Sequence, residues 1–414
     1  MNVSKTMKSE YTIFTVCNIA YLPKALVLAK SVLKFNDIKL KIFLVDRKSE
    51  MDISKYDADL IWIEDIDIPN FNQLAFKYDV IEFCTSLKPY LALKLLETNK
   101  KVIFFDPDIC TYDSVTSILN ALEFHSIILT PHYTTPLSNH KKPGWNNDLG
   151  MMRFGSFNLG FFAVKDSLQG LDFLKWWSER CMQLCYKESQ FGLSTDQKWI
   201  SIAPCFFKDL HVSFNLGYNV APWNIFERSI KKNENGNYII NDVYPLVFFH
   251  FSNFDKMDVG YSKEMSNYSG EINRSCLFEL GTEYLKSLSQ EEMKVEKKVY
   301  SFDYMTGGEY ISLTLRRAYA SIISELPQNH NPFDSKGLVG YFAKKNHLFE
   351  RKIKVEPKKS IGFQDIEANK TKIKYIYKLM RIILRLIGPN KFNDLSNLLV
   401  YLSSYRQNRG LWKL

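Results

Sequence analysis

Residues 101–108 have the sequence KVIFFDPD, and this stretch decides the fold class. Its bulky apolar run is typical of a buried strand of a parallel sheet. Because residues two apart in an extended chain point to the same side, Asp106 and Asp108 are expected to face one small volume. Open α/β sheets keep their ligand crevices at the carboxyl ends of their strands. The pair therefore predicts a site for Mg²⁺ or Mn²⁺ shared with substrate phosphates, and a simple Asp-Pro turn is the structural alternative.

Strands and helices alternate along the chain on both sides of this stretch. Short apolar runs predict strands over 11–17, 39–46, 60–64, 101–105, 126–130, 158–164 and 246–251. Helical periodicity predicts helices over 23–34, 78–98 with a break at Lys88-Pro89, 167–187 and 195–202. This alternation predicts an α/β fold with a layered, mostly parallel sheet through residue 250.

Composition is that of a globular protein with a sizeable core. The chain has 414 residues, of which 46% are hydrophobic and 24% charged. Residues 1–10 are polar and no uncharged apolar run approaches a membrane span, so we expect neither a secretory signal nor a transmembrane helix. Seven scattered cysteines without a CxxC pair predict reduced thiols in a cytoplasmic protein and no zinc site.

Positive charge is concentrated at the C-terminal end of the chain. The net charge is +9, and residues 341–414 contain 17 Lys and Arg against 5 Asp and Glu, a net +12. The first 340 residues therefore have a net charge of −3. This asymmetry predicts an anionic partner surface for the tail, either a membrane or a nucleic acid.

Two polar motifs follow the aspartate pair. The sequence FNLG at 157–160 places Asn158 and Gly160 at a strand start, where glycine permits close backbone approach to a ligand or marks an ordinary bulge. The sequence TDQ at 195–197 has an N-cap-like Thr195, and its polar side chains are placed to point into a cleft. Helix capping alone would also explain Thr195 and Asp196.

A third motif, VFFHFSNFDK, occupies residues 247–256. His250 at the end of this apolar strand is a candidate to complete a metal site with the two aspartates, since neutral imidazole is acceptable to Mn²⁺. A satisfied structural histidine is the alternative. Lys256 is a candidate point charge for a phosphate.

These motifs, in this order, resemble those of the nucleotide-sugar-dependent glycosyltransferases with the GT-A fold. The resemblance is greatest to the retaining enzymes of glycosyltransferase family 8 and to related bacterial surface-polysaccharide enzymes, and it covers about residues 10–256. It implies a Rossmann-like, mostly parallel central sheet with helices on both faces, followed by a C-terminal helical extension.

The resemblance also implies roles for particular residues. Asp106, Asp108 and His250 would hold Mn²⁺ or Mg²⁺ against the donor diphosphate. Lys256 would contact the same diphosphate, in a family pattern His-x-x-Gly-x-x-Lys whose glycine is Asn253 here.

Further residues would bind the donor substrate. Asn158, Gly160, Asp196 and Gln197 match positions that contact the transferred sugar, with Asp196 and Gln197 as the catalytic candidates. The base and ribose of the nucleotide would lie against the end of the first strand, where the matching residues are Thr15, Cys17, Asn18 and Tyr21. An aspartate that the family often has in this segment is missing here. Lys88 would contact the phosphates or the sugar of the donor. Asp106 would contact the donor through the metal. Residues 218–224 resemble an aromatic segment that borders the cleft in the related bacterial enzymes.

The activity that the resemblance implies is transfer of a hexosyl group from a nucleoside-diphosphate sugar, with UDP as the expected nucleotide. The acceptor would be a glycan or a lipid-linked oligosaccharide in surface polysaccharide biosynthesis, such as capsule or lipopolysaccharide. Gln197 would lie opposite the leaving group, which supports retention by a same-face, oxocarbenium-like route.

The chain is expected to divide into four parts. These are a catalytic domain at 1–256, a mixed helical extension at 257–350, a basic linker at 351–369 and a basic amphipathic tail at 370–414. The tail has a basic helical face formed by Lys374, Lys378, Arg381 and Arg385. An apolar side is formed by Ile373, Ile376, Met380, Ile383 and Ile387, and Gly388-Pro389 ends the helix. A second amphipathic stretch follows at 393–406.

Two interpretations of this tail stay open. A basic amphipathic helix fits an anionic bilayer, which predicts a peripheral location on the inner face of the cytoplasmic membrane. The alternative is a helical hairpin docked on the catalytic body.

Two other functions remain as alternatives for the whole chain. One is a non-catalytic scaffold with a GT-A-like fold. The other is a basic protein that binds nucleic acid or membrane, although the sequence has no zinc-finger, RNA-recognition or helix-turn-helix signature and we expect no nucleic-acid partner.

Overall fold

The computed structural model describes residues 8–136, 148–252, 254, 274–349 and 370–412. The chain divides into two compact units. The first comprises Met1–Pro69 and Val80–Ser301, and the second comprises Asn70–Asp79 and Phe302–Leu414. The expected boundaries at 256, 350 and 369 fall on residues outside the described ranges, so the four-part division stays a prediction.

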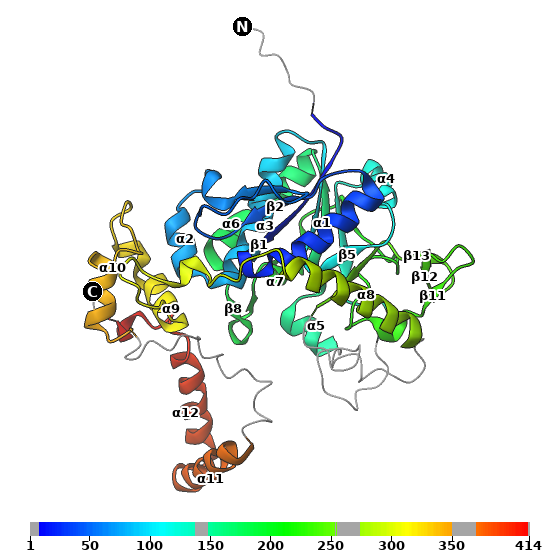
Figure 1. Ribbon diagram of the computed structural model, residues 1–414. Helices are drawn as coiled ribbons and strands as arrows, with labels where there is room; N and C mark the ends of the chain where they lie inside the picture. The colour runs from blue at the N-terminus through cyan, green and yellow to red at the C-terminus, as the bar shows by residue number, and fades with distance from the viewer. Residues whose placement is uncertain (1–7, 137–147, 253, 255–273, 350–369, 413–414) are drawn as a thin grey trace. The chain divides into compact units, whose positions relative to one another are not determined.

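A seven-stranded sheet forms the centre of the first unit, in the order β10-β6-β7-β4-β1-β2-β3. Strands β1 and β2 of this sheet are labelled in Figure 1. Its strands are β1 Thr12–Cys17, β2 Lys41–Leu44, β3 Asp59–Trp62, β4 Lys101–Phe105, β6 Ile127–Pro131, β7 Phe157–Lys165 and β10 Leu210–Val212. Neighbouring strands run parallel except where β7 lies between β4 and β6 and runs antiparallel to both. The predicted mostly parallel sheet is therefore confirmed.

Helices cover both faces of this sheet. The helices are α1 Leu22–Asn36, α3 Val80–Leu96, α4 Thr116–Phe124 and α6 Leu168–Leu184. On one face, Ile103 and Phe105 belong to a core cluster with residues of α1 and α4. On the other face, Phe104 stacks on Phe162, which in turn contacts Trp177 of α6. Burial on both faces explains why the strand sequences are continuously apolar, and the expected α/β fold with helices on both faces of the sheet is confirmed.

The predicted break at Lys88-Pro89 is wrong, because α3 continues through both residues. Leu87 and Leu91 on either side of the proline are fully buried. Their burial outweighs the loss of one helical hydrogen bond at Pro89.

Several smaller elements complete the first unit. A two-stranded pair joins β5 Ile109–Thr111 to β14 Phe248–His250 outside the central sheet. The further strands and α-helices of the described residues in this unit are β8 Lys187–Glu188, β9 Leu193–Ser194, β11 Ile230–Lys232, β12 Tyr238–Ile240, β13 Tyr244–Pro245, α5 Asp148–Phe154, α7 Gln197–Ile200 and α8 Arg274–Glu292. The predicted late strand at 246–251 thus forms, but as the partner of β5.

The second unit is helical. Its helices are α2 Phe71–Lys77, α9 Leu313–Ile322, α10 Leu338–Lys345, α11 Lys370–Ile387 and α12 Pro389–Leu402. Buried Arg316 of α9 donates hydrogen bonds to the carbonyl oxygens of Ala75, Phe76 and Tyr78, which ties α2 to this unit despite its early position in the chain. The predicted helical extension is confirmed, and α11 ends before Gly388 as expected. None of the described helices is long and apolar enough to cross a membrane.

Candidate active site

The aspartate pair lies in a turn at the carboxyl end of β4. The N–H of Ile109 donates to the carbonyl oxygen of Asp106 at 3.0 Å, so the chain turns here before it continues into β5. The N–H of Asp106 donates to the carbonyl oxygen of Gly160 at 2.8 Å, which continues the antiparallel pairing of β4 with β7. The sequence left two alternatives for this pair: an Asp-Pro turn, or two carboxylates that face the same small volume. Both occur in the structure.

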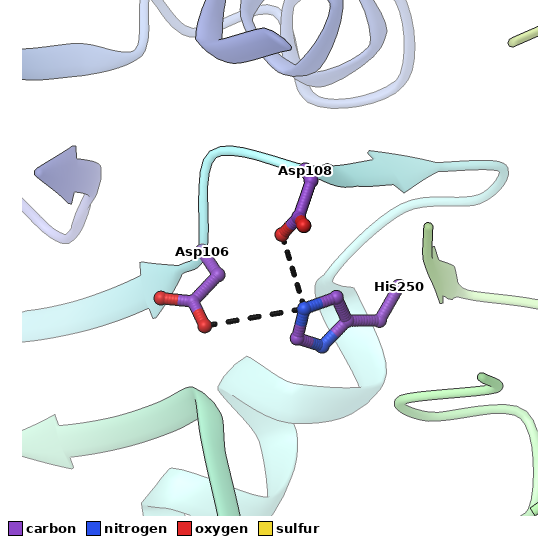
Figure 2. A group of neighbouring side chains, drawn as sticks. All are labelled: Asp106, Asp108 and His250. Carbon is purple, nitrogen blue, oxygen red and sulfur yellow. Dashed lines mark ion pairs between the residues drawn. The ribbon is translucent and has the colours of Figure 1, made fainter. Parts of the chain in front are cut away.

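His250 reaches this turn through the pairing of β14 with β5. The N–H of Phe251 donates to the carbonyl oxygen of Asp108, which fixes the end of β14 beside the pair. The Nε2 atom of His250 lies 3.0 Å from Oδ1 of Asp108 and 4.0 Å from Oδ2 of Asp106. All three side chains point toward one another (Figure 2), and their ligand atoms lie within 4.8 Å of each other.

The environment keeps Asp108 ionised. Burial raises the pKa of its carboxyl group, but interactions with His250 and Lys24 lower it more, so the net pKa lies below the usual value. A charged carboxylate is thus held beside the imidazole. Two hard oxygen ligands and one imidazole nitrogen form a donor set that suits Mn²⁺ or Mg²⁺.

Lys88 forms ion pairs both with Asp106 of the candidate metal site and with Asp196, one of the two catalytic candidates. Its ammonium, buried on α3, lies 3.0 Å from Oδ1 of Asp106 and 3.4 Å from Oδ2 of Asp196, and it donates to the carbonyl oxygen of Leu159 at 3.0 Å. Burial lowers the pKa of Lys88, but the two carboxylates outweigh it and the pKa is raised. Burial raises the pKa of Asp196, and the charge of Lys88 offsets part of this rise. The predicted contact of Lys88 with the donor stays a proposal.

Gly160 lies directly against the histidine ring. A Cβ atom at this position would lie 2.4 Å from Cε1 and 2.7 Å from Nδ1 of His250. The side-chain oxygen of Asn158 accepts a hydrogen bond from the N–H of Gly160 at 3.1 Å. Close backbone approach therefore accounts for glycine here, although the approaching group is a protein side chain. The register between β6 and β7 also shifts over this stretch, from Leu129 opposite Phe162 to Pro131 opposite Phe157, so the close approach and a strand irregularity occur together.

Asp196 and Gln197 lie at the start of the short helix α7. Thr195 has a left-handed φ of 47°, and Asp196 occupies the N-cap position without a side-chain capping bond, so the N-cap role predicted for Thr195 is wrong. Asp196 is 2% exposed. The amide of Gln197 donates to the carbonyl oxygen of Phe154 at 3.0 Å and accepts from the N–H of Leu159 at 3.5 Å. These bonds hold Gln197 beside the start of β7.

The nucleotide-binding candidates lie at the end of β1, next to β4 in the sheet. The parallel register pairs Phe14 with Phe104, so Asn18 follows β1 at the same edge of the sheet as Asp106. Thr15 and Cys17 are buried within the sheet, and burial raises the pKa of the Cys17 thiol. Tyr21 is 45% exposed. Asn18 and Tyr21 are thus the candidates placed beyond the strand end.

Two predicted residues cannot be placed. Lys256 and Asn253 lie outside the described residues, so the contact of Lys256 with a diphosphate stays a prediction.

The residue-by-residue prediction assigned no role to Asn219, Thr130 or Trp223. The amide nitrogen of Asn219 donates to Oγ1 of Thr130 and to the side-chain oxygen of Asn158. Its amide oxygen lies 3.3 Å from Nδ1 of His250, and the ring of Trp223 packs edge-on against the imidazole with centroids 5.1 Å apart. The sequence feature that pointed to Asn219 and Trp223 was the segment 218–224, which was expected to border the cleft although its residues were given no individual roles.

Residues 42–197 match the model of a family described as nucleotide-diphospho-sugar transferase. Among curated proteins, the chain is 25% identical over 190 residues to the uncharacterized protein YfnF of Bacillus subtilis (strain 168), covering 45% of this chain and 61% of YfnF. It is 27% identical over 180 residues to YfnD of the same organism, covering 42% of this chain and 54% of YfnD. The chain thus spans between half and two thirds of the length of these curated relatives.

Solved glycosyltransferase structures are also similar to this chain. The galactosyltransferase LgtC, solved with donor and acceptor sugar analogues, is 17% identical with a TM-score of 0.39, covering 66% of this chain and 95% of LgtC. The glycosyltransferase GlyE of Streptococcus pneumoniae TIGR4 is 17% identical with a TM-score of 0.37, covering 71% of this chain and 67% of GlyE.

The family match includes the aspartate pair, Asn158, Gly160, Asp196 and Gln197, whereas His250 lies beyond its end. Over residues 42–197, the chain is therefore similar to the nucleotide-diphospho-sugar transferase family.

Proposed function

We propose that this protein is a metal-dependent hexosyltransferase that uses a nucleoside-diphosphate sugar, with UDP as the preferred nucleotide. The observation that carries the proposal is the convergence of Asp106, Asp108 and His250, whose ligand atoms lie within 4.8 Å of one another. The match of residues 42–197 to the nucleotide-diphospho-sugar transferase family supports it. The acceptor we propose is a glycan or a lipid-linked oligosaccharide of surface polysaccharide biosynthesis.

The residues present fit a bound Mn²⁺ or Mg²⁺. Asp106 and Asp108 would provide oxygen ligands and His250 would provide Nε2, with Gly160 leaving room for the ring. When bound, such an ion supplies Lewis-acid stabilisation of the negative charge on a departing diphosphate.

The chain's own residues would position the sugar and balance the charge. Asp196, buried beside the ammonium of Lys88, would accept hydrogen bonds from sugar hydroxyls. Lys88 keeps two carboxylates close together by neutralising part of their repulsion, and Lys256 would add positive charge at the diphosphate. Asn158 and Gly160 would border the sugar, and Asn18 and Tyr21 the nucleotide, with Thr15 and Cys17 beneath them.

Retention is proposed through a same-face route. The bond from the anomeric carbon to the diphosphate oxygen breaks, the acceptor hydroxyl forms the new bond from the same side, and its proton leaves with the diphosphate. The amide of Gln197 would face the anomeric carbon from the opposite side. An amide is a poor nucleophile, which favours this route over a stable covalent intermediate.

A thermal-shift screen of nucleotide sugars, with and without Mn²⁺, tests donor, base and metal dependence together. We expect UDP-sugars with Mn²⁺ to raise the melting temperature by several degrees, and the sugar without the metal to raise it far less. Release of UDP, measured in the same samples, separates an enzyme from a non-catalytic scaffold. An equal shift with and without Mn²⁺, or no shift with any nucleotide sugar, would contradict the proposal.

We also propose that the tail helices bind an anionic bilayer, which would bring the protein to lipid-linked acceptors at the inner face of the cytoplasmic membrane. The basic face of α11 is flanked by an exposed apolar stripe of Tyr375, Leu379, Ile382 and Leu386, which are 68%, 57%, 52% and 78% exposed. This stripe is displaced by one residue, about 100° around the helix, from the basic residues. The apolar side predicted from the sequence is the less exposed one overall, because Ile373 and Ile383 are partly buried.

A charge-matched pair of variants tests the tail. Changing Lys374, Lys378, Arg381 and Arg385 together to Gln removes four charges worth about 1 kcal/mol each near an anionic bilayer, so binding to phosphatidylglycerol vesicles should fall several-hundred-fold. The control changes four exposed lysines of the first unit to Gln: Lys39, Lys48, Lys94 and Lys231. Equal vesicle binding by the two variants, or none by the unaltered protein, would refute the membrane proposal.

A further inference from the structure

Asn219 is buried beside the proposed metal site in a conformation that few residue types adopt. It is 0% exposed and has a left-handed φ of 51°. Its carbonyl oxygen accepts a hydrogen bond from the side chain of Asn224 at 2.9 Å. The next residue, Val220, accepts a hydrogen bond from the N–H of His250 at 2.7 Å. The backbone of Asn219 is therefore fixed relative to the strand that presents His250.

The direction of each hydrogen bond around Asn219 follows from one backbone donor. The N–H of Gly160 can only donate, so the Asn158 atom that it contacts is the amide oxygen. This side-chain oxygen of Asn158 also lies 3.0 Å from an amide atom of Asn219. Because the oxygen can only accept, that atom of Asn219 must be the donor, its NH₂ group. The same NH₂ group donates to Oγ1 of Thr130 at 3.1 Å. The remaining amide atom of Asn219, its oxygen, therefore faces His250.

This orientation determines which nitrogen of His250 carries hydrogen. An amide oxygen accepts but never donates, so Nδ1 of His250, 3.3 Å away, must be the protonated ring nitrogen. When a cation is bound, Nε2 is then the ring atom left to coordinate it, and Nε2 lies toward Asp108 and Asp106 at 3.0 and 4.0 Å. Trp223, whose ring is nearly perpendicular to the imidazole, and Gly160, which lies against its Cε1 and Nδ1 atoms, both limit rotation of the ring.

We infer that Asn219 is a positioning residue for the metal site, which holds the His250 ring as the tautomer that directs the lone pair of Nε2 at the two carboxylates. The inference rests on the proposed function, because it gives Asn219 its role through a divalent cation. Partners that fix the second ring nitrogen of a ligand histidine typically contribute about 10- to 100-fold in metal affinity.

Asn219→Gly and Asn241→Gly form a matched pair for the test. Asn241 also has a left-handed φ, of 52°, and its side chain likewise accepts one hydrogen bond, from the N–H of Ser229, and donates another, to the carbonyl oxygen of Glu227. Glycine adopts this conformation readily, so both variants lose an amide without backbone strain. Calorimetric titration with Mn²⁺ should give an affinity about 10- to 100-fold weaker for Asn219→Gly and an unchanged affinity for Asn241→Gly.

A spectroscopic measurement separates positioning from general loss of structure. In full-length protein labelled with ¹⁵N-histidine and loaded with Mg²⁺, the Nδ1 proton of His250 should give a resonance protected from exchange with water. The resonance is assigned by its absence in His250→Gln. It should persist in Asn241→Gly and disappear in Asn219→Gly.

The outcomes distinguish this inference from the proposed function. Absence of Mn²⁺ binding by the unaltered protein would overturn the proposed function, whereas the Nδ1 resonance would still report the hydrogen bond to Asn219. Unchanged Mn²⁺ affinity in Asn219→Gly, an equal loss in Asn241→Gly, or no protected Nδ1 proton in the unaltered protein would overturn the role of Asn219.

Discussion

The edge of the central sheet and the tail helices both concentrate charge, but they do so in opposite ways. At the sheet edge, Lys88 and Asp196 are 4% and 2% exposed, and each charged group lies within a few ångströms of a named partner. On α11, the basic residues lie on an exposed helix beside Leu379 and Leu386, which are 57% and 78% exposed. Buried charges depend on single partners, whereas exposed charges act as a sum. The first region should therefore respond strongly to one substitution and the second only weakly.

The largest effect is expected at the aspartate pair. Asp108→Ala removes a ligand whose contribution to catalysis is several kcal/mol, so transfer should fall about a thousandfold or more at any Mn²⁺ concentration. Release of UDP under saturating donor measures the effect. Asp59→Ala, which removes an exposed carboxylate paired with Lys41, is the control and should retain normal activity. Near-normal turnover in Asp108→Ala would contradict the metal assignment.

The next effect is on stability, at Lys88. Lys88→Met leaves the carboxylates of Asp106 and Asp196 without their shared cation, which should lower the free energy of unfolding by about 3 kcal/mol or more. Urea unfolding at neutral pH measures this change. Lys94→Met on the same helix breaks an exposed pair with Glu97 and a distant contact with the Tyr90 ring, and it should leave the unfolding midpoint nearly unchanged. Similar midpoints for the two variants would show that the Lys88 cluster contributes no more than a surface pair.

A smaller loss is expected at Gly160. In Gly160→Ala the new methyl group would meet the His250 ring, so the ring or the strand must shift, at a cost of about 1 to 3 kcal/mol in unfolding free energy. Mn²⁺ affinity should fall as well, because the imidazole moves. Gly410→Ala, whose methyl group meets no atom within 4 Å, is the control. Unaltered metal affinity in Gly160→Ala would mean that the ring position does not matter for binding.

The smallest effect is expected for one charge of the tail. Lys378→Gln should weaken binding to anionic vesicles by about fivefold, the equivalent of about 1 kcal/mol, with transfer to a soluble acceptor unchanged. Cosedimentation at two salt concentrations measures the loss, which should shrink at high salt through screening. A hundredfold loss from this one change would indicate a specific binding pocket on α11. The tail would then depend on single residues, as the sheet edge does, and the proposed difference between the two regions would be contradicted.

Most strands of the sheet could be predicted because a strand that is buried on both faces has a continuously apolar sequence. The run before Asp106 is apolar at every position that the two helical layers cover, and its spacing placed both aspartates at one edge. The break at Pro89 was a wrong prediction because local propensity cannot weigh the burial of Leu87 and Leu91.

The candidate site was predicted only as far as its residues belong to recognisable motifs. His250 was named in advance, but its approach to Asp108 depends on the pairing of β14 with β5, which no local pattern reveals. Asn219 was assigned no role because its contacts with Asn158 and His250 join segments 61 and 31 residues away. Neither the left-handed backbone nor the hydrogen-bond directions can be inferred from neighbouring residues.

The central claim is that Asp106, Asp108 and His250 bind one divalent cation, and titration calorimetry with Mn²⁺ in the presence of UDP tests it most directly. We predict one saturable site in the unaltered protein, no measurable site in Asp108→Ala, and an affinity at least about tenfold weaker in His250→Ala. Equal Mn²⁺ affinity in the unaltered protein and in both variants, or no saturable binding in the unaltered protein, would contradict the account.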